Sequence, residues 1–428
     1  MEFGEFFILI YQDLYFYGTI YLLFLLLYFF IFKNEIWGIL DPLLLETISM
    51  GSAAFCVFVL AYLNSIKYKY LFSFVATELG LIIGIKISKY LPKIIFKNPI
   101  FKNQNPNSFA IFLFITEILS LTMEIISLVT IGIVVLNENI NHVSAYEGFG
   151  IIKAFLFSSR SILFTSLIYK KFHLKKKYSI FDIICFIIMF LGTVTNGSKS
   201  AILSFFSIYF ISIYPDVYNG IRRKLKINFL LILAIVSFPL LVITLTSNRN
   251  LLSSLLALFG RFVASGDVFV LGYNDAVLKH IKESSFFRYV FYPGFGTILK
   301  TIGISITPPS IIGYDINEYW YNNREVGPNA RHNYLGLVFF GYYWSILYSS
   351  LLGFIFGYAR KLYKNSNPAK QNYAVHIFLV LFILYAFTII TDINVFLNNI
   401  FWITALIIII FGMSKVFFHI IKLSKLNK

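Results

Sequence analysis

The sequence predicts an all-α polytopic membrane protein, and three observations carry that prediction. Hydrophobic residues make up 58% of the 428 residues, and aromatic residues make up 19%. Charged residues account for only 13%, against about 25% in a typical soluble domain. The apolar residues also form runs close to the length of about 20 residues that a helix needs to cross a bilayer. Because a soluble core could not bury all 49 Phe, lipid must act as the solvent for much of the surface.

Eleven apolar segments are candidate membrane-spanning helices, and one more helix near the N-terminus would make twelve. They are residues 14–32, 43–66, 71–91, 109–136, 149–168, 179–195, 200–214, 229–246, 335–357, 373–390 and 400–418. The chain then divides into 1–246 with helices one to eight, a large loop at 247–334, and 335–428 with helices nine to eleven.

The distribution of basic residues predicts the orientation of these helices. The net charge of +16 is concentrated in short runs between apolar segments, which argues against nucleic-acid binding. Because Lys and Arg favour the cytoplasmic side, the C-terminus and the basic loops are expected there. The large loop and the loops at 137–148 and 391–399 then face outward. Lys67 and Lys69 are the exception, since their loop would also face outward.

The segment 247–334 is too long for a simple connector and is expected to be structured. Its first part, Asn250–Ser265 ("NLLSSLLALFGRFVAS"), has apolar residues at helical spacing and predicts an amphipathic helix at the membrane interface. "YPGFG" and "TPPS" indicate turns. "INEYWYNN" is aromatic, as surfaces that bind sugars or lie at the membrane interface often are.

Basic residues stand at two membrane boundaries of this segment. Arg261 lies on the predicted amphipathic helix, and Arg331 and His332 lie in "GPNARHNYLG", just before an apolar run. Arginine binds phosphate bidentately and keeps its charge, so these positions suit a lipid-linked phosphate. His332 could be a general base that titrates near neutral pH or an interfacial residue that caps the next helix. Both interpretations are open at this point.

A second polar stretch, "TNGSKSAILSFF" (Thr195–Phe206), predicts an outward turn between helices six and seven that carries Lys199. Its backbone N–H groups near a helix start favour anions, although a plain hairpin has the same sequence features. Several ionisable residues also fall inside predicted helices, where each needs a partner or a cavity. Glu117 and Arg160 are at equal predicted depth on neighbouring helices, which predicts a structural ion pair between them.

No metal or soluble-cofactor motif is present in the sequence. Cys56 and Cys185 lie in apolar runs without a CxxC spacing, and neither a Walker A loop nor HExxH occurs. A DxD-like acidic pair, which would bind the metal ion that accompanies a nucleotide-sugar substrate, is also missing. The sequence therefore predicts chemistry carried by its own side chains.

Three stretches resemble Wzy-type polymerases of the O-antigen polymerase/ligase superfamily. "TNGSKSAILSFF" resembles their Gly-Ser-Arg turn and following helix, with Lys199 where arginine is commoner. Because lysine lacks the planar fork of arginine, a phosphate role of Lys199 is less well supported. "GRFVASGD" with the long loop resembles the Arg-bearing outer segment of the polymerases. "GPNARHNYLGLVFFGYYWSI" is similar to the His-Asn stretch that ends the loop and opens the next helix in both groups. By layout, the resemblance extends over most of the chain.

The resemblance implies a GT-C-like, metal-independent glycosyltransferase in the bacterial inner membrane. Such an enzyme moves a growing glycan from undecaprenyl diphosphate onto a new lipid-linked repeat unit at the periplasmic face, and a polysaccharide chain-length regulator is an expected partner. Arg261 and Arg331 would stabilise the leaving diphosphate, and His332 would activate the acceptor hydroxyl. The candidate substrate-binding residues are Lys199, Arg249, Arg324, Asn333 and Arg160.

Three other functions remain to be distinguished. An O-antigen ligase shares the His-Asn stretch but transfers the glycan to the lipid A core. A flippase for lipid-linked oligosaccharides would place its charges in a central cavity and have short loops, which the segment 247–334 argues against. A non-catalytic scaffold would not need arginines at the membrane boundary.

Overall fold

The computed structural model describes residues 2–92, 106–134, 146, 148–195, 201–221, 253, 259–281, 285–304, 306–324, 327–368 and 371–426. The chain forms two compact units. The first unit comprises Met1–Pro92, Leu255–Lys361 and Ala386–Leu397. The second unit comprises Lys93–Ser254, Leu362–Tyr385 and Asn398–Lys428.

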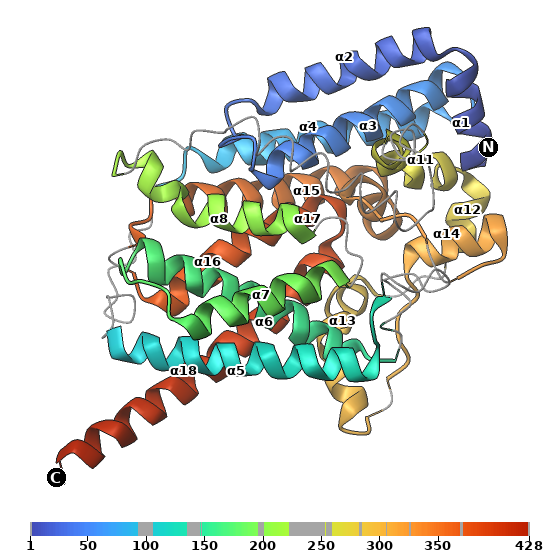
Figure 1. Cartoon of the computed structure of the whole chain (residues 1–428). Coiled ribbons are helices and arrows are strands. Elements are labelled where there is room, and N and C mark those ends of the chain that lie inside the picture. Colours follow the sequence, from blue (N-terminus) through green and yellow to red (C-terminus); the bar gives the residue numbers. More distant parts are fainter. Residues whose placement is uncertain are drawn as a thin grey trace. The chain divides into compact units, whose positions relative to one another are not determined.

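The first unit is built on three neighbouring antiparallel helices (Figure 1), α2 (Leu14–Phe32), α3 (Pro42–Tyr62) and α4 (Tyr68–Ser88). Asp41 precedes α3 and accepts a hydrogen bond from the Leu43 N–H, which caps the helix in front of Pro42. The remaining helices of the unit are α1 (Phe3–Gln12), η4 (Ala264–Gly266), α11 (Asp267–Gly272), α12 (Asp275–His280), α13 (Phe286–Thr301), α14 (Ile312–Tyr321), α17 (Thr388–Thr391) and most of α15 (His332–Lys364).

The second unit packs α5 (Pro106–Thr130) against α6 (Gly150–Phe172) and α7 (Ile180–Thr195). Helix α6 also packs against α8 (Ala201–Tyr218), which contains Pro215. The unit is completed by α16 (Tyr373–Ala386) and by most of α18 (Ile393–Leu426).

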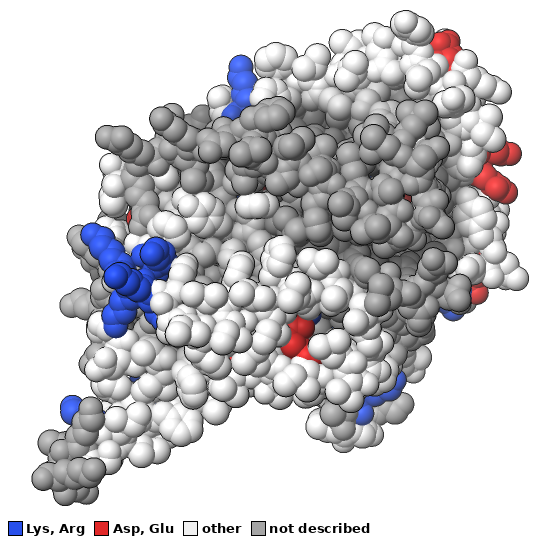
Figure 2. All heavy atoms as spheres, in the orientation of Figure 1, with Lys and Arg blue, Asp and Glu red and all other residues white. Residues whose placement is uncertain are grey.

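Eight helices of the described residues are long and apolar enough to cross a membrane. The prediction of a helical, polytopic membrane protein is therefore confirmed at this level. Of these eight helices, α2 is the most exposed, since only 17% of its most apolar 18-residue stretch is buried. On the face drawn in Figure 2, uncharged residues cover most of the described surface, as expected for a surface in contact with lipid. The predicted helix at 229–246 lies outside the described residues.

Helix α15 reverses direction at Gly341, which has φ 69° and ψ −170°. A straight helix would separate His332 from Ser349 by about 25 Å. Instead, His332 Nδ1 is 2.9 Å from Ser349 Oγ. Only glycine adopts this backbone conformation without strain. Residues 332–340 therefore form a short arm that folds back along the long arm, residues 342–364.

The prediction that Arg331 and His332 stand at the start of a helix agrees with α15, which begins at His332, directly after Arg331. They begin the short arm, and the short arm contacts α4 at Glu78, the eleventh of its 21 residues. The sequence pattern shows one apolar run, and the single residue Gly341 decides whether that run is one helix or two arms. Residues 331–337 are all buried, so the protein itself encloses the first part of the short arm.

Glycines bring α4 and the long arm of α15 into close backbone contact. A Cβ atom at Gly84 would lie 2.0 Å from the Ser350 carbonyl oxygen, and one at Gly353 would lie 2.2 Å from the Leu81 carbonyl oxygen. Both helices carry the small-xxx-small spacing, with Gly80 four residues before Gly84 and Gly353 four before Gly357. This contact holds the long arm beside Glu78.

We expect Gly84→Ala to destabilise the protein by about 1–3 kcal/mol, because the helix backbones would have to separate. Gly18→Ala on α2 is the matched control, since nothing lies within 4 Å of a Cβ at Gly18. The control should be neutral or stabilising by up to about 1 kcal/mol. Thermal unfolding of the detergent-solubilised protein measures both. Equal melting temperatures for the two variants would contradict the close packing.

Lys67 and Lys69, the exceptions to the predicted charge distribution, both pair with Asp275. Lys69 Nζ is 2.9 Å from Asp275 Oδ1. Hydrogen bonds from Lys67 and from Tyr70 hold the pKa of the Asp275 carboxyl well below its usual range. The start of α4 and the start of α12 therefore lie together, and the two lysines share one carboxylate.

The other end of the long α15 arm is fixed by a buried arginine. Arg360 Nη1 donates to Asp41 Oδ1 at 3.0 Å, and Nη2 donates to the Glu35 carbonyl at 2.9 Å. The guanidinium lies 3.8 Å from the centre of the Trp37 ring. A planar fork suits this combination of bidentate pairing and stacking.

Candidate functional site

The residues of the His-Asn stretch meet α3, α4 and the long arm of α15 in one buried cluster of the first unit. Arg331, His332 and Asn333 are each at most 2% exposed. Three consecutive residues can point to different neighbours here because the chain changes from a loop to a helix at His332. Each of the three side chains then contacts a different helix or pair of helices.

Arg331 binds α3. Its Nη2 donates to Glu46 Oε1 at 2.8 Å, and its Nη1 donates to Ser49 Oγ at 2.6 Å. Both partners of this ion pair are at most 3% exposed. Removing either partner would leave an isolated charge in a buried setting, which is strongly unfavourable.

His332 lies between the long arm of α15 and α4. Its Nδ1 is 2.9 Å from Ser349 Oγ, and its Nε2 is 3.6 Å from Glu78 Oε1. In the tautomer whose Nδ1–H donates to Ser349, Nε2 carries a lone pair. A proton taken up at Nε2 would then face the carboxylate of Glu78, which stabilises an imidazolium.

Asn333 fixes the position of Glu78. Its Nδ2 donates to Thr77 Oγ1 at 2.9 Å and to Glu78 Oε1 at 3.2 Å. The Thr77 hydroxyl in turn donates to the Ser73 carbonyl at 2.7 Å. Asn333 therefore holds one oxygen of the Glu78 carboxyl on the side of His332.

Four buried polar atoms of this cluster have no hydrogen-bond partner among the described residues. They are Arg331 Nε, His332 Nε2, Asn333 Oδ1 and Glu78 Oε2. Buried polar atoms are nearly always paired, so a concentration of unpaired ones in one place requires an explanation such as water or a ligand. Donors and acceptors are both present, which suits a hydroxyl group that gives up a proton.

The chain reaches this cluster through a connection packed against α14. A Cβ at Gly313 would lie 2.1 Å from the Pro328 carbonyl oxygen, and one at Gly327 would lie 2.0 Å from the Gly313 carbonyl oxygen. Asn329 is exposed, whereas Ala330 and all residues from Arg331 to Leu337 are buried. The exposed surface nearest to the cluster along the chain is therefore at Asn329.

Ionisation of Asp267 makes the stability of the folded protein depend on pH. This residue begins α11 and is partly buried, and burial raises its pKa to about 7 despite the Val268 N–H and the charge of Arg331. The unfolded chain releases this proton at a pKa of about 3.9. The folded state therefore binds the proton more tightly, so stability decreases as pH rises from about 4 to about 7.

We expect Asp267→Asn, which stays neutral at every pH, to flatten this decrease and to raise the melting temperature at pH 8. At pH 3 the variant and the wild type should melt at the same temperature, because Asp267 is then mostly protonated in both the folded and the unfolded state. Thermal unfolding across this pH range measures the effect. An unchanged slope in the variant would show that another group causes the pH dependence.

The other predicted site residues are not part of this cluster as described. Arg261 is an exposed helical residue, and no ion pair or hydrogen bond of its side chain occurs among the described residues. Arg324 is engaged by acidic neighbours: its Nη2 is 2.8 Å from Asp315 Oδ1 and its Nε is 3.4 Å from Glu318 Oε2. Lys199, Arg249 and half of the predicted amphipathic helix 250–265 lie outside the described residues.

The predicted ion pair between Glu117 and Arg160 is wrong. In the second unit, Arg160 binds Glu124, and its Nη2 is 2.6 Å from Glu124 Oε2. Equal depth on two helices does not fix how far they are shifted along each other, and Glu124 is two turns beyond Glu117 on α5. Gly192 on α7 leaves the room that this pair fills, since a Cβ there would lie 2.2 Å from Glu124 Oε2.

Sequence reasoning missed the acidic half of the cluster. Glu46 and Glu78 are visible as acids inside apolar helices, and such acids usually have a partner. That signal could have linked them to the Arg-His pair. Ser49, Thr77 and Ser349 carry no such signal, because hydroxyls often bond to the backbone of their own helix.

Within the described part of the chain, no group of three or more His, Cys, Asp or Glu could hold a metal ion. Comparison of the chain with protein-family models, with curated proteins and with solved structures found no match.

Proposed function

We propose that the chain is a Wzy-type O-antigen polymerase: a glycosyltransferase that extends undecaprenyl-diphosphate-linked glycans at the periplasmic face. One observation carries the proposal. Arg331, His332 and Asn333, which carry the resemblance to the His-Asn stretch of that family, converge on Glu46 and Glu78 and leave polar atoms unpaired. Such a cluster provides a base together with the group that stabilises its conjugate acid.

In the proposed reaction, the hydroxyl oxygen of the acceptor sugar attacks the anomeric carbon of the growing chain. The bond from that carbon to the diphosphate oxygen breaks, and the bonding electrons stay with the diphosphate. His332 Nε2 takes the hydroxyl proton, and Glu78 at 3.6 Å stabilises the resulting imidazolium. The proton is later released to water.

The departing diphosphate gains negative charge, which fixed cations stabilise. Arg331 keeps its Nε–H free of any described partner, while Glu46 and Ser49 hold its other nitrogens. Arg261 is exposed, so its side chain can bind a phosphate group at the protein surface. The proposal therefore assigns Arg331 to the reacting centre and Arg261 to binding of the lipid-linked substrate.

A second candidate function is a proton-coupled flippase for lipid-linked oligosaccharides. The observation that favours it is the pairing of His332 with Glu78 at the midpoint of α4, on a folded-back arm. Ionisable pairs inside membranes and broken helices are common along transport pathways. The ligase is the remaining alternative, because it shares the same stretch of residues.

Complementation of a bacterial strain that lacks its own copy of this gene tests the proposal. A polymerase restores the ladder of glycan lengths, whereas the empty vector leaves single repeat units on the lipid carrier. A ligase would leave the polymer made but not attached to the lipid A core when the gene is deleted. A flippase would leave single units on the cytoplasmic side of the deletion strain, where an external glycosidase cannot reach them. Either of the last two results contradicts the proposal.

A further inference from the structure

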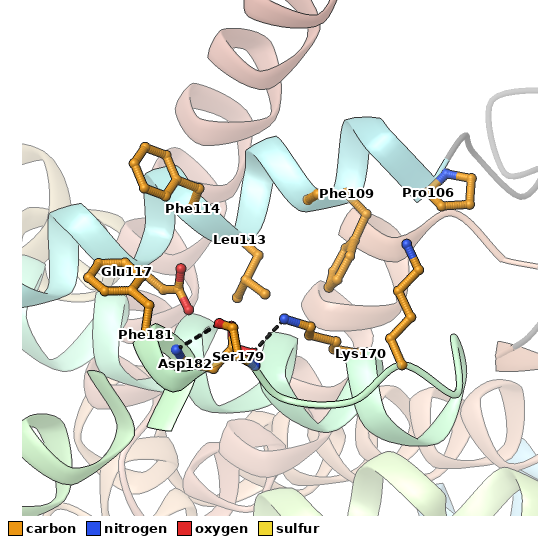
Figure 3. A pocket seen from close by; sticks show the side chains of 11 residues that line it. Pro106, Phe109, Leu113, Phe114, Glu117, Lys170, Ser179, Phe181 and Asp182 are labelled. Carbon is orange, nitrogen blue, oxygen red and sulfur yellow. Dashed lines mark hydrogen bonds and ion pairs between the residues drawn. The ribbon is translucent and has the colours of Figure 1, made fainter. Parts of the chain in front are cut away.

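A pocket in the second unit lies between the start of α5, the end of α6 and the start of α7, and it has no part in the proposed reaction. Its volume is about 360 Å³. Apolar side chains make up much of its wall, including Phe109, Leu113, Phe114 and Phe181 (Figure 3). Four ionisable residues also line it: Glu117, Lys170, Lys176 and Asp182.

Two of these charges neutralise each other. Lys170 pairs with Asp182, and the Ser179 N–H also donates to the Asp182 carboxyl. Figure 3 shows the Glu117 side chain extending from α5 toward this group. Glu117 is only 3% exposed and its carboxyl lies against that of Asp182, while its Oε1 has no hydrogen-bond partner among the described residues.

Lys176 is the remaining charge. Its side chain is exposed, and it forms no ion pair with another described residue. After the internal pair is subtracted, the pocket presents an acceptor deep inside, at Glu117, and a cation near its rim, at Lys176. A ligand that matches both must carry a hydrogen-bond donor of positive charge and an anionic group.

The pocket also opens toward the lipid-facing surface. Phe114, which lines it, is 55% exposed, and Ile118, one turn further along α5, is 45% exposed. The polar end lies beside the basic stretch Lys170–Lys177, where lipid headgroups meet the helix ends. The ligand must therefore have an apolar tail that remains in the membrane.

We propose that this pocket binds a phospholipid with a primary-ammonium headgroup, of the phosphatidylethanolamine type. Its ammonium group donates to Glu117 Oε1, its phosphate pairs with Lys176, and its acyl chains leave past Phe114. A trimethylammonium headgroup has no N–H for Glu117, and a glycerol headgroup has no cation for it. The pocket therefore selects the ethanolamine headgroup over both.

Native mass spectrometry of the full-length protein in detergent tests this assignment. Phosphatidylethanolamine, phosphatidylcholine and phosphatidylglycerol are added at equal concentrations. We expect the ethanolamine lipid to bind about tenfold more tightly than the other two, since a charge-assisted hydrogen bond contributes about 1.5–3 kcal/mol. Glu117→Gln and Lys176→Gln should each remove most of this preference. Lys177→Gln is the matched control, because Lys177 is exposed in the same stretch and does not line the pocket.

Equal binding of the three lipids by the wild-type protein overturns the proposal, as does an equal loss in Lys177→Gln and Lys176→Gln. Lys176 is exposed, so its variant should fold even if Glu117→Gln does not. Free phosphoethanolamine is added in a separate arm. If it binds as tightly as the lipid, the ligand is a soluble zwitterion and the lipid assignment is wrong.

Discussion

Replacement of His332 by Gln is expected to abolish glycan polymerisation while the protein still inserts into the membrane. Glutamine can keep a hydrogen bond to Ser349, but it cannot accept the acceptor proton. General-base catalysis contributes about 10²–10⁴-fold to a rate, so the loss should shorten the ladder to one or a few repeat units. The ladder measures activity, and an immunoblot of the membrane fraction measures insertion.

His419→Gln is the matched control for this variant. His419 is an exposed residue of α18, and the same substitution there should leave a full ladder. The two variants differ only in where the imidazole is lost. A full ladder from His332→Gln, with normal membrane levels, would remove His332 from the proposed reaction.

Unpairing the Arg331–Glu46 ion pair is expected to have the largest effect on stability. Arg331→Gln leaves the Glu46 carboxylate buried without a cation, and breaking a buried pair in this way costs about 3–5 kcal/mol. The double variant Arg331→Gln/Glu46→Gln removes both charges and should recover most of that loss. Thermal unfolding of the solubilised proteins measures the three free energies.

Lys69→Gln is the control for Arg331→Gln, because Lys69 is 44% exposed and its partner Asp275 is 37% exposed. Exposed pairs contribute about 0–1 kcal/mol, so this variant should melt close to the wild type. The ladder of glycan lengths then shows whether Arg331 is needed for activity as well as for stability. We expect the double variant Arg331→Gln/Glu46→Gln to be stable and inactive. A stable and active double variant would show that Arg331 serves the fold alone.

The sequence was sufficient to predict that helices cross a membrane and roughly where they lie. The predicted segment 14–32 agrees with α2, Leu14–Phe32, because an apolar run in lipid has few alternatives to a helix. The reversal at Gly341 could not be predicted in this way. Whether an apolar run is one helix or two arms depends on tertiary packing, here the contact of His332 with Ser349.

Pairings between helices were harder to predict than the helices themselves. The family resemblance singled out Arg331, His332 and Asn333, and these residues do share one cluster. Their acidic partners come from α3 and α4, more than 250 positions away, and no local pattern connects such positions. The failed pairing of Glu117 with Arg160 has the same origin, since sequence depth leaves the shift between neighbouring helices undetermined.

Reaction of the purified protein with its substrate tests the proposed polymerase activity directly. Lipid-linked repeat units are extracted from a strain that lacks this gene, added to the protein in proteoliposomes, and analysed for glycan length and free undecaprenyl diphosphate. We expect one undecaprenyl diphosphate to be released for each new glycosidic bond, without added metal, and no product from His332→Gln. Repeat units that stay single in the presence of a folded wild-type protein would contradict the proposed activity.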